Sequence, residues 1–349
     1  MSILLIIWWS CVALAAISLM AMAGLIVQRS AWNQRDRHDA ARRDQLKSLA
    51  WQLMEHPERF PEFEKDLRAE DRRLLLHLFS DLLKRVTGKY AERFVRVMRM
   101  MGIVEECMTR IRDRRWVIRA ESCAILGVFP DPAVKMGLYR ALDDPMPEVR
   151  VEAARSLVRL GAVRSVMELI HYLVTEEGLP SLAVVDLFRN LGSGSVAELL
   201  ELLRGETTVA AKVVVIDALG HSNDLQAVPA LLEFYAHPVK NVRMATLQSL
   251  GLLRDPRASP AVLLAMTDSD WEVRTQAAIT AGQIGVNEAI PLLEQLLEDE
   301  HWWVRYRAAE ALHRVGGRGI EALHSASTRA HPFAAEIAWG VLREKGLAA

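Results

Sequence analysis

The first 28 residues form an uninterrupted apolar segment. From Met1 to Gln28 the chain has no charged side chain, and Trp8, Trp9 and Trp32 lie near the two ends of this stretch. About 20 apolar residues in a helix span the ~30 Å hydrocarbon core of a bilayer, and indole rings favour its interface with water. The pattern therefore predicts one transmembrane helix over residues 1–28.

Basic residues follow this segment and none precedes it. They are Arg29, Arg35, Arg37, Arg42, Arg43 and Lys47. By the positive-inside rule this asymmetry predicts that the C-terminal part is cytoplasmic and the short N-terminus is outside. A cleaved signal peptide is an alternative, because residues 21–23 resemble a cleavage site, but such peptides carry basic residues before their apolar core. A buried core helix is a further alternative, although a helix that is apolar on every side suits lipid better.

Residues 29–88 are charged at first and then amphipathic. Apolar positions recur at helical spacing up to residue 56, where Pro57 and Pro61 interrupt the pattern, and again over residues 70–86. We expect this segment to be a helical neck that holds the membrane anchor away from a folded domain.

The remaining chain contains an internal repeat of 31 residues. An arginine that follows Ile or Val marks it, at Arg119, Arg150, Arg243, Arg274 and Arg305. The two positions that the period skips fall on Ser181 and Lys212, within segments that keep the apolar pattern. Seven copies therefore align without an insertion, as in proteins built from stacked repeats.

Other residues recur at fixed distances from the repeat arginine. An Asp precedes it by six residues in four copies, and a Gly follows it by eight or eleven; Pro229, Pro260 and Pro291 are also 31 residues apart. These positions predict one helical hairpin per repeat, with Pro in the first turn of helix A. Asp is expected to cap helix B, and Gly to end it in a left-handed conformation.

The stretch from Asp268 to Gly285 resembles the HEAT-repeat class, in particular the short bacterial type named after phycobilisome lyases. The resemblance covers about residues 89–349 and implies an all-α fold, an α-solenoid of stacked helical hairpins. The transmembrane helix predicted over residues 1–28 precedes this solenoid. Degenerate first and last copies are expected near residues 89–102 and 331–346. The copy at residues 180–194 departs most from the pattern, because it lacks both the Asp and the Val-Arg pair.

Charge is balanced overall but unevenly distributed. The chain has 43 Lys and Arg against 44 Asp and Glu, which argues against a protein that coats nucleic acid. Basic residues concentrate over residues 84–119. Within this region the candidates for binding an acidic partner or anionic lipid are Lys89, Arg93, Arg96, Arg99, Arg112, Arg114 and Arg115, the first four on one helix face. An ordinary solvated helix is the alternative.

Tryptophans occupy one position of the repeat. Trp116, Trp271 and Trp302 each precede the repeat arginine by three residues, and Trp303 follows the last of them. Such a row can stack on nucleic-acid bases, as in HEAT-like DNA glycosylases, or pack one helix B on the next. The three cysteines match neither a disulfide framework nor a zinc motif.

Motifs for catalysis are missing from the sequence: no P-loop, dinucleotide-binding, zinc-protease or nucleophile-elbow pattern occurs. We therefore expect neither catalytic residues nor a cofactor or metal site. The predicted function is a non-catalytic scaffold at the bacterial inner membrane that binds a partner protein. Alternatives are an accessory subunit of a membrane enzyme complex such as one in envelope glycan synthesis, a lyase or glycosylase, and a module that binds an anionic lipid surface.

Overall fold

The computed structural model describes residues 44–53, 55–65, 88–174, 181–191, 193–329 and 331–347, with isolated positions between residues 9 and 78. Almost all of residues 1–28 lie outside this part of the chain, so the transmembrane helix stays a prediction. Among the residues that are described, none of the helices is both long and apolar enough to cross a bilayer.

The chain forms two compact units, Met1–Thr109 and Arg110–Ala349. In the first unit, helical residues 44–53 end just before Pro57, as expected, and are followed by η1 (Pro57–Arg59) and α2 (Phe60–Glu64). Helix α4 (Lys89–Met100) and most of α5 (Ile103–Arg110) complete it. The helix expected over residues 70–86 lies largely outside the described residues.

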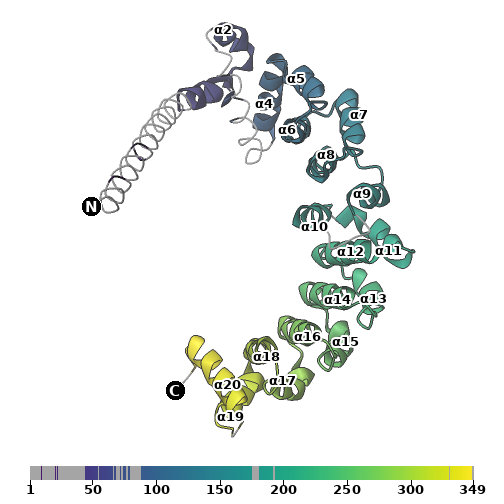
Figure 1. The fold of residues 1–349 in the computed structure, drawn as a ribbon, viewed down its shortest axis with the longest axis vertical. Coiled ribbons are helices and arrows are strands. Elements are labelled where there is room, and N and C mark those ends of the chain that lie inside the picture. The colour runs from purple at the N-terminus through teal and green to yellow at the C-terminus, as the bar shows by residue number, and fades with distance from the viewer. Residues whose placement is uncertain are drawn as a thin grey trace. The chain divides into compact units, whose positions relative to one another are not determined.

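The second unit consists of helical hairpins in two layers (Figure 1). The B layer contains α6 (Trp116–Leu126), α8 (Pro147–Arg159), α10 (Leu182–Arg189), α12 (Val209–His221), α14 (Lys240–Leu253), α16 (Trp271–Ile284) and α18 (Trp302–Val315). The A layer contains α7 (Pro132–Ala141), α9 (Val166–Leu173), α11 (Val196–Arg204), α13 (Ala227–Leu232), α15 (Ser259–Ala265) and α17 (Ile290–Leu296). The last hairpin consists of α19 (Gly317–Ser327) and α20 (Pro332–Glu344), and short 3₁₀ turns η2 (Ser193–Ser195), η3 (Pro256–Ala258) and η4 (Asn287–Ala289) precede three of the A helices.

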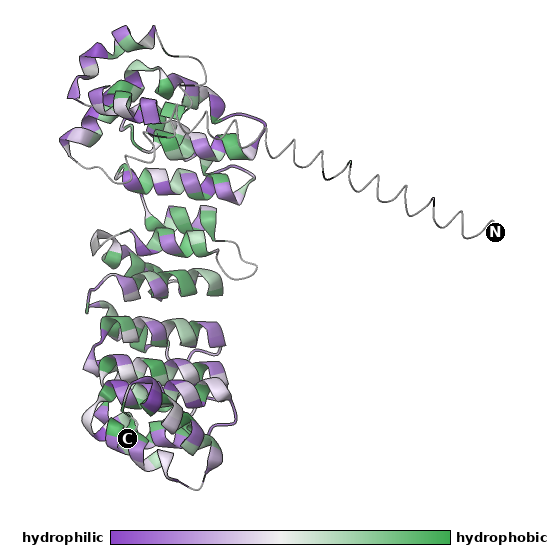
Figure 2. Cartoon of the chain, turned by 90° about the vertical axis from the view of Figure 1, so that its left-hand side faces the viewer, coloured by the Kyte–Doolittle hydropathy of each residue, from purple (hydrophilic) through white to green (hydrophobic). Residues whose placement is uncertain are grey.

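Each hairpin buries an apolar stripe that it cannot cover alone. Hydrophobic and hydrophilic residues alternate along the helices (Figure 2), and the buried positions are mostly Leu, Val and Ala, such as Leu138 and Leu157. Because adjacent hairpins cover these stripes, the described part of the second unit is the all-helical repeat stack that the 31-residue period predicts. Pro260 and Pro291 lie in the first turns of α15 and α17, also as expected.

The glycine eleven residues after the repeat arginine ends helix B in a left-handed conformation. The backbone φ angle is positive at Gly161, Gly285 and Gly316, and also at the equivalent Asn223 and Arg254. This part of the sequence prediction is confirmed. At Asn223 and Arg254 the backbone adopts this conformation although the residue is not glycine. The position therefore requires a positive φ angle, at a steric cost to the side chain.

The glycine eight residues after the arginine has a different role. Gly220 and Gly282 lie inside or near the end of a B helix, where the next B helix passes close by. A Cβ added to Gly282 would lie 2.9 Å from the Cα of Ala311, and one added to Gly220 would lie 2.7 Å from the Cα of Ser249. This glycine therefore sets the spacing between successive B helices.

Buried hydroxyl groups bridge the same contact between helices. The Oγ of Ser156 donates to the carbonyl of Cys123, the Oγ of Ser249 to that of Ile216, and the Oγ1 of Thr280 to that of Leu247, at 2.8–2.9 Å. Because each buried hydroxyl group has a hydrogen-bond partner, these residues can lie where the backbones of two B helices approach closely.

We expect Gly282→Val to lower the free energy of unfolding by about 1–3 kcal/mol, because the new side chain forces two backbones apart. Gly251→Val should cost less, since its nearest neighbour is the movable end of the Gln283 side chain. Thermal and urea unfolding of the purified chain measure both effects.

Gly205→Val is the control, because the nearest atoms to a Cβ there are 3.6 Å away. A Gly282→Val protein as stable as this control would show that the B helices do not depend on close approach.

Candidate protein-binding surface

The repeat arginine joins the loop of its own hairpin to the loop of the next. In Arg274, Nη1 donates to the carbonyl of Asp268 at 2.9 Å, while Nε and Nη2 donate to the two carboxylate oxygens of Asp299 at 2.8 and 3.1 Å. Arg119 and Asp144 form the same pair, and Arg243 reaches both Asp268 and Asp270. We call each such pair a rung. In these three copies the repeat arginine therefore pairs with an Asp of the next repeat.

The repeat Asp is not a helix cap, contrary to the sequence prediction. Oδ1 of Asp299 accepts from the backbone N–H of His301 at 2.9 Å, and Asp144 does the same with Met146. His301 and Met146 are themselves the N-cap residues, and neither makes a side-chain cap. The carboxylate instead closes a turn before the helix and faces the arginine of the preceding repeat.

The carboxylates of Asp299 and Asp144, which pair with Arg274 and Arg119, are largely buried. Burial alone would raise the pKa of Asp299, but hydrogen bonds from Arg274 and from the N–H of His301 outweigh it, so the pKa lies below its usual value. The same causes lower the pKa of Asp144, with Arg119 as the partner. Stability from these groups is therefore present above the ordinary aspartate pKa of about 3.9 and is lost as pH falls further.

The rungs stop in the middle of the second unit. Arg150 keeps its bonds to its own loop, but its Nε donates to the carbonyl of Tyr172 at 2.9 Å instead of to a carboxylate. The next two copies have Ser181 and Lys212 in place of arginine. A pocket of about 550 Å³ opens beside Arg150. The rungs resume at Arg243.

At the C-terminal end, Arg305 has no carboxylate among its described contacts. Its Nη1 donates to the carbonyls of Asp299 and Glu300, and its guanidinium lies 4.6 Å from the ring centroid of Phe333. A cation–π contact thus replaces the ion pair of the preceding rungs.

The tryptophans of the repeat lie at the first turns of B helices and are unequally covered. Trp271 stacks on His301 of the next hairpin at 5.2 Å, which supports the packing interpretation for this residue. Trp116 is 40% exposed, Trp302 47% and Trp303 50%. These three extend into solvent.

An aromatic cluster surrounds the start of α18. Trp302 stacks on Tyr306 at 5.1 Å and meets Trp303 edge-on at 4.8 Å, and Arg307 lies over the rings of Trp303 and Tyr306. Phe333, at the first turn of α20, is 52% exposed. We call Trp302, Trp303, Tyr306 and Phe333 the aromatic surface. Exposed Trp beside Tyr and Arg is a composition typical of protein-binding hot spots.

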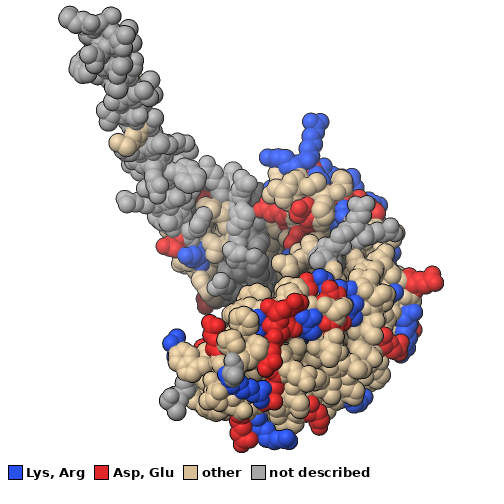
Figure 3. Space-filling view, turned by 60° about the horizontal axis from the view of Figure 1, so that its bottom comes forward, with Lys and Arg blue, Asp and Glu red and all other residues tan. Residues whose placement is uncertain are grey.

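The basic candidates fall in two places. Lys89, Arg93, Arg96 and Arg99 lie on α4 opposite its buried Phe94, Val97 and Met98, so the predicted shared face is present. Arg112, Arg114 and Arg115 are exposed in the loop before α6, in the second unit. Elsewhere acidic and basic side chains interleave on the described surface, as one face shows (Figure 3).

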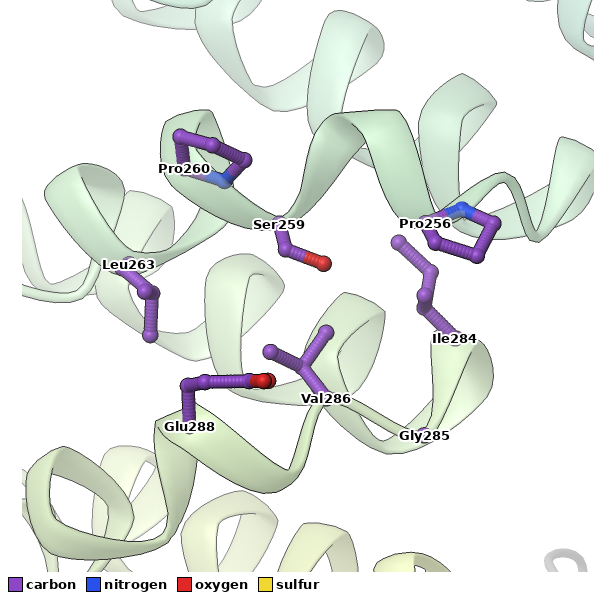
Figure 4. Close-up of a pocket in the computed structure, with 8 residues that line it drawn as sticks. All are labelled: Pro256, Ser259, Pro260, Leu263, Ile284, Gly285, Val286 and Glu288. Atoms are coloured by element: carbon purple, nitrogen blue, oxygen red, sulfur yellow. The ribbon is translucent and has the colours of Figure 1, made fainter.

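A further pocket, of about 490 Å³, lies between the turns before α15 and α17 (Figure 4). Ser259 and Glu288 supply its polar side chains, and its lining has neither His nor Cys. Within the described residues, no three His, Cys, Asp or Glu side chains are placed to hold a metal ion.

Comparison with known proteins identifies the family to which the repeats belong. The family model described as HEAT repeats matches residues 104–180, 196–265 and 259–338, more than half of the chain. No curated protein is similar enough to match the sequence.

Several solved structures are distantly similar. The complex of CpcE and CpcF of phycocyanin lyase from Nostoc sp. PCC7120 is 20% identical over 64% of this chain and 94% of its own, with a TM-score of 0.33. YibA of E. coli is 14% identical over 80% and 94%, with a TM-score of 0.37. An engineered protein is 17% identical over 80% and 82%, with a TM-score of 0.33.

We expect Arg274→Ala to destabilise the second unit by about 3 kcal/mol, because it leaves the buried carboxylate of Asp299 without its counter-charge. Arg155→Ala is the control: Arg155 pairs with Glu152 on one helix at a more exposed position, so its loss should cost under about 1 kcal/mol. Equal melting temperatures for the two variants would contradict the structural role of the rung.

Proposed function

Because the chain belongs to the HEAT-repeat family, we propose that it is a membrane-tethered scaffold whose aromatic surface binds a partner protein and which performs no catalysis. The aromatic surface is the observation that carries this proposal. Trp302, Trp303 and Phe333 each leave about half of their surface in water. Exposed aromatic side chains grouped in this way are unfavourable unless another surface covers them.

The distribution of polar groups supports a binding role. The repeat arginines and aspartates are engaged in the contacts between hairpins, and the buried hydroxyls in the contacts between B helices. What the second unit offers to a partner is therefore its helix ends and outward faces. Extended stacks of repeats commonly present such surfaces to other proteins.

The membrane tether rests on the sequence. Residues 1–28 are long and apolar enough to span a bilayer, and the basic flank that follows favours a cytoplasmic second unit. The resemblance to the short bacterial repeat type points to the inner membrane. A tether raises the concentration of the repeat stack near membrane proteins, so a moderate affinity is sufficient for association. An accessory subunit of a membrane enzyme complex is one form of this role.

The proposal is tested on washed membranes from cells that produce the full chain. The chain should stay in the pellet after an alkaline carbonate wash, as a spanning protein does. After detergent solubilisation, one partner should co-purify with the wild type and at least about tenfold less with Trp302→Ala/Trp303→Ala.

The matched control is Leu264→Ala, which truncates an exposed apolar side chain on α15. Partner recovery that is the same for the tryptophan variant and this control would overturn the assignment of the surface, and release by carbonate would overturn the tether.

The basic face of α4 favours a second role, binding to anionic lipid. Basic residues near a charged membrane contribute about 1 kcal/mol each. In vesicles made with and without anionic lipid, Arg93→Glu/Arg96→Glu/Arg99→Glu should abolish any lipid-dependent protection of α4 from protease while leaving helix content unchanged. Protection that is identical for wild type and variant, or independent of lipid charge, would contradict this role.

A further inference from the structure

Helix α20 presents an outward stripe that the described chain does not cover. Its buried side is formed by Ala334, Ala338, Val341 and Leu342. On the other side lie Glu336, Trp339, Gly340 and Arg343, all exposed. Trp339 has half of its surface in water, and no other part of the protein comes within 4 Å of a Cβ built at Gly340.

The spacing within the stripe is that of a helix–helix contact. Positions 336, 339 or 340, and 343 are separated by three or four residues, so they follow one line along the helix. A large side chain at 339 beside a glycine at 340 gives a protrusion and a recess at the same height. Neighbouring helices pack by fitting such pairs together.

The stripe is complementary to itself when it is turned end to end. The midpoint between Glu336 and Arg343 falls between Trp339 and Gly340. An antiparallel pairing of two α20 helices about that point places Glu336 of one copy opposite Arg343 of the other, twice. It also places the Trp339 ring of each copy over Gly340 of the other. A two-fold symmetric interface requires a surface that is complementary to itself in this way.

Neither charge of the stripe is committed elsewhere in the part of the chain that is described. Glu336 has no ion pair there, and Arg343 lies over the ring of Trp339 at 4.9 Å, which holds its guanidinium on the same stripe. A Glu and an Arg two turns apart, neither in an ion pair within the described residues, are the groups that an antiparallel copy would pair.

We propose that this protein self-associates through α20 as a two-fold symmetric, antiparallel helix pair centred between Trp339 and Gly340. The helix is 13 residues long, or about 20 Å, so the contact is smaller than that of a permanent dimer and the expected dissociation constant is micromolar. The four residues of the stripe are not part of the aromatic surface, although Phe333 of that surface lies on the same helix, three residues before Glu336. Each dimer would therefore carry two copies of that surface.

The test is a charge exchange in the full chain, purified in detergent and measured by sedimentation with the detergent density-matched, over about 1–200 µM protein. The wild type should change from monomer to dimer across this range. Glu336→Arg alone and Arg343→Glu alone should each weaken dimerisation at least about tenfold, because each places like charges opposite one another. The two single variants mixed together should form a heterodimer, and Glu336→Arg/Arg343→Glu in one chain should restore self-association.

Glu321→Arg is the matched control, because Glu321 is exposed on α19 away from the stripe, and it should dimerise like the wild type. All variants retain the apolar residues 1–28, so association through that segment would not respond to the charges. Circular dichroism checks that the total helix content of each variant matches that of the wild type. A wild type that stays monomeric throughout, a dimer that survives both reversals, or a mixture that fails to re-associate overturns the proposal. Partner binding through Trp302 and Trp303 is measured separately, so the failure of one proposal leaves the other testable.

Discussion

Where the repeats carry a rung, at Arg119, Arg243 and Arg274, their stacking depends on one arginine side chain. Its guanidinium bonds the carbonyls of its own loop and the carboxylate of the next loop, so a single side chain fixes the distance and the rotation between two hairpins. Charged groups at this depth are stable only when they are paired, as in the Arg274–Asp299 rung, where all three guanidinium nitrogens and both carboxylate oxygens find a partner. The glycine and hydroxyl contacts between B helices act at the other end of the same helices and fix how closely they approach.

The arginine–aspartate rungs also explain which polar groups of the repeat remain able to contact other molecules. Where the rungs continue, from Arg243 to Asp299, the polar groups of the repeat are engaged in stacking. Where they end, at Arg305, the arginine turns to Phe333 and the neighbouring tryptophans are half exposed. Polar groups of the repeat are thus left outside the rungs in two places. One is the middle of the second unit, where Arg150 lines a pocket. The other is the end of the stack, where both the aromatic surface and the stripe on α20 lie.

Much of the fold follows from the sequence because its signals are local and periodic. The 31-residue spacing predicts the hairpins, and the glycine at the end of helix B predicts the left-handed residue at Gly161, Gly285 and Gly316. The role of Gly282 is not local, since it depends on the small side chain of Ala311 in the next hairpin. The same holds for Asp299, which a local pattern identifies as a cap but which the preceding repeat uses as a counter-charge. Exposure of the tryptophans likewise depends on what the neighbouring hairpin covers.

We expect the middle of the second unit to be its weakest part, because the rungs between loops are missing there and Arg189 and Asp217 supply the one bidentate pair that is described between α10 and α12. Native-state hydrogen exchange along the full chain tests this most directly. We expect the slowest amides of α10 and α11 to exchange at least about tenfold faster than those of α14 and α16, after correction for intrinsic rates. Equal protection across these four helices would contradict the central role of the arginine–aspartate rung.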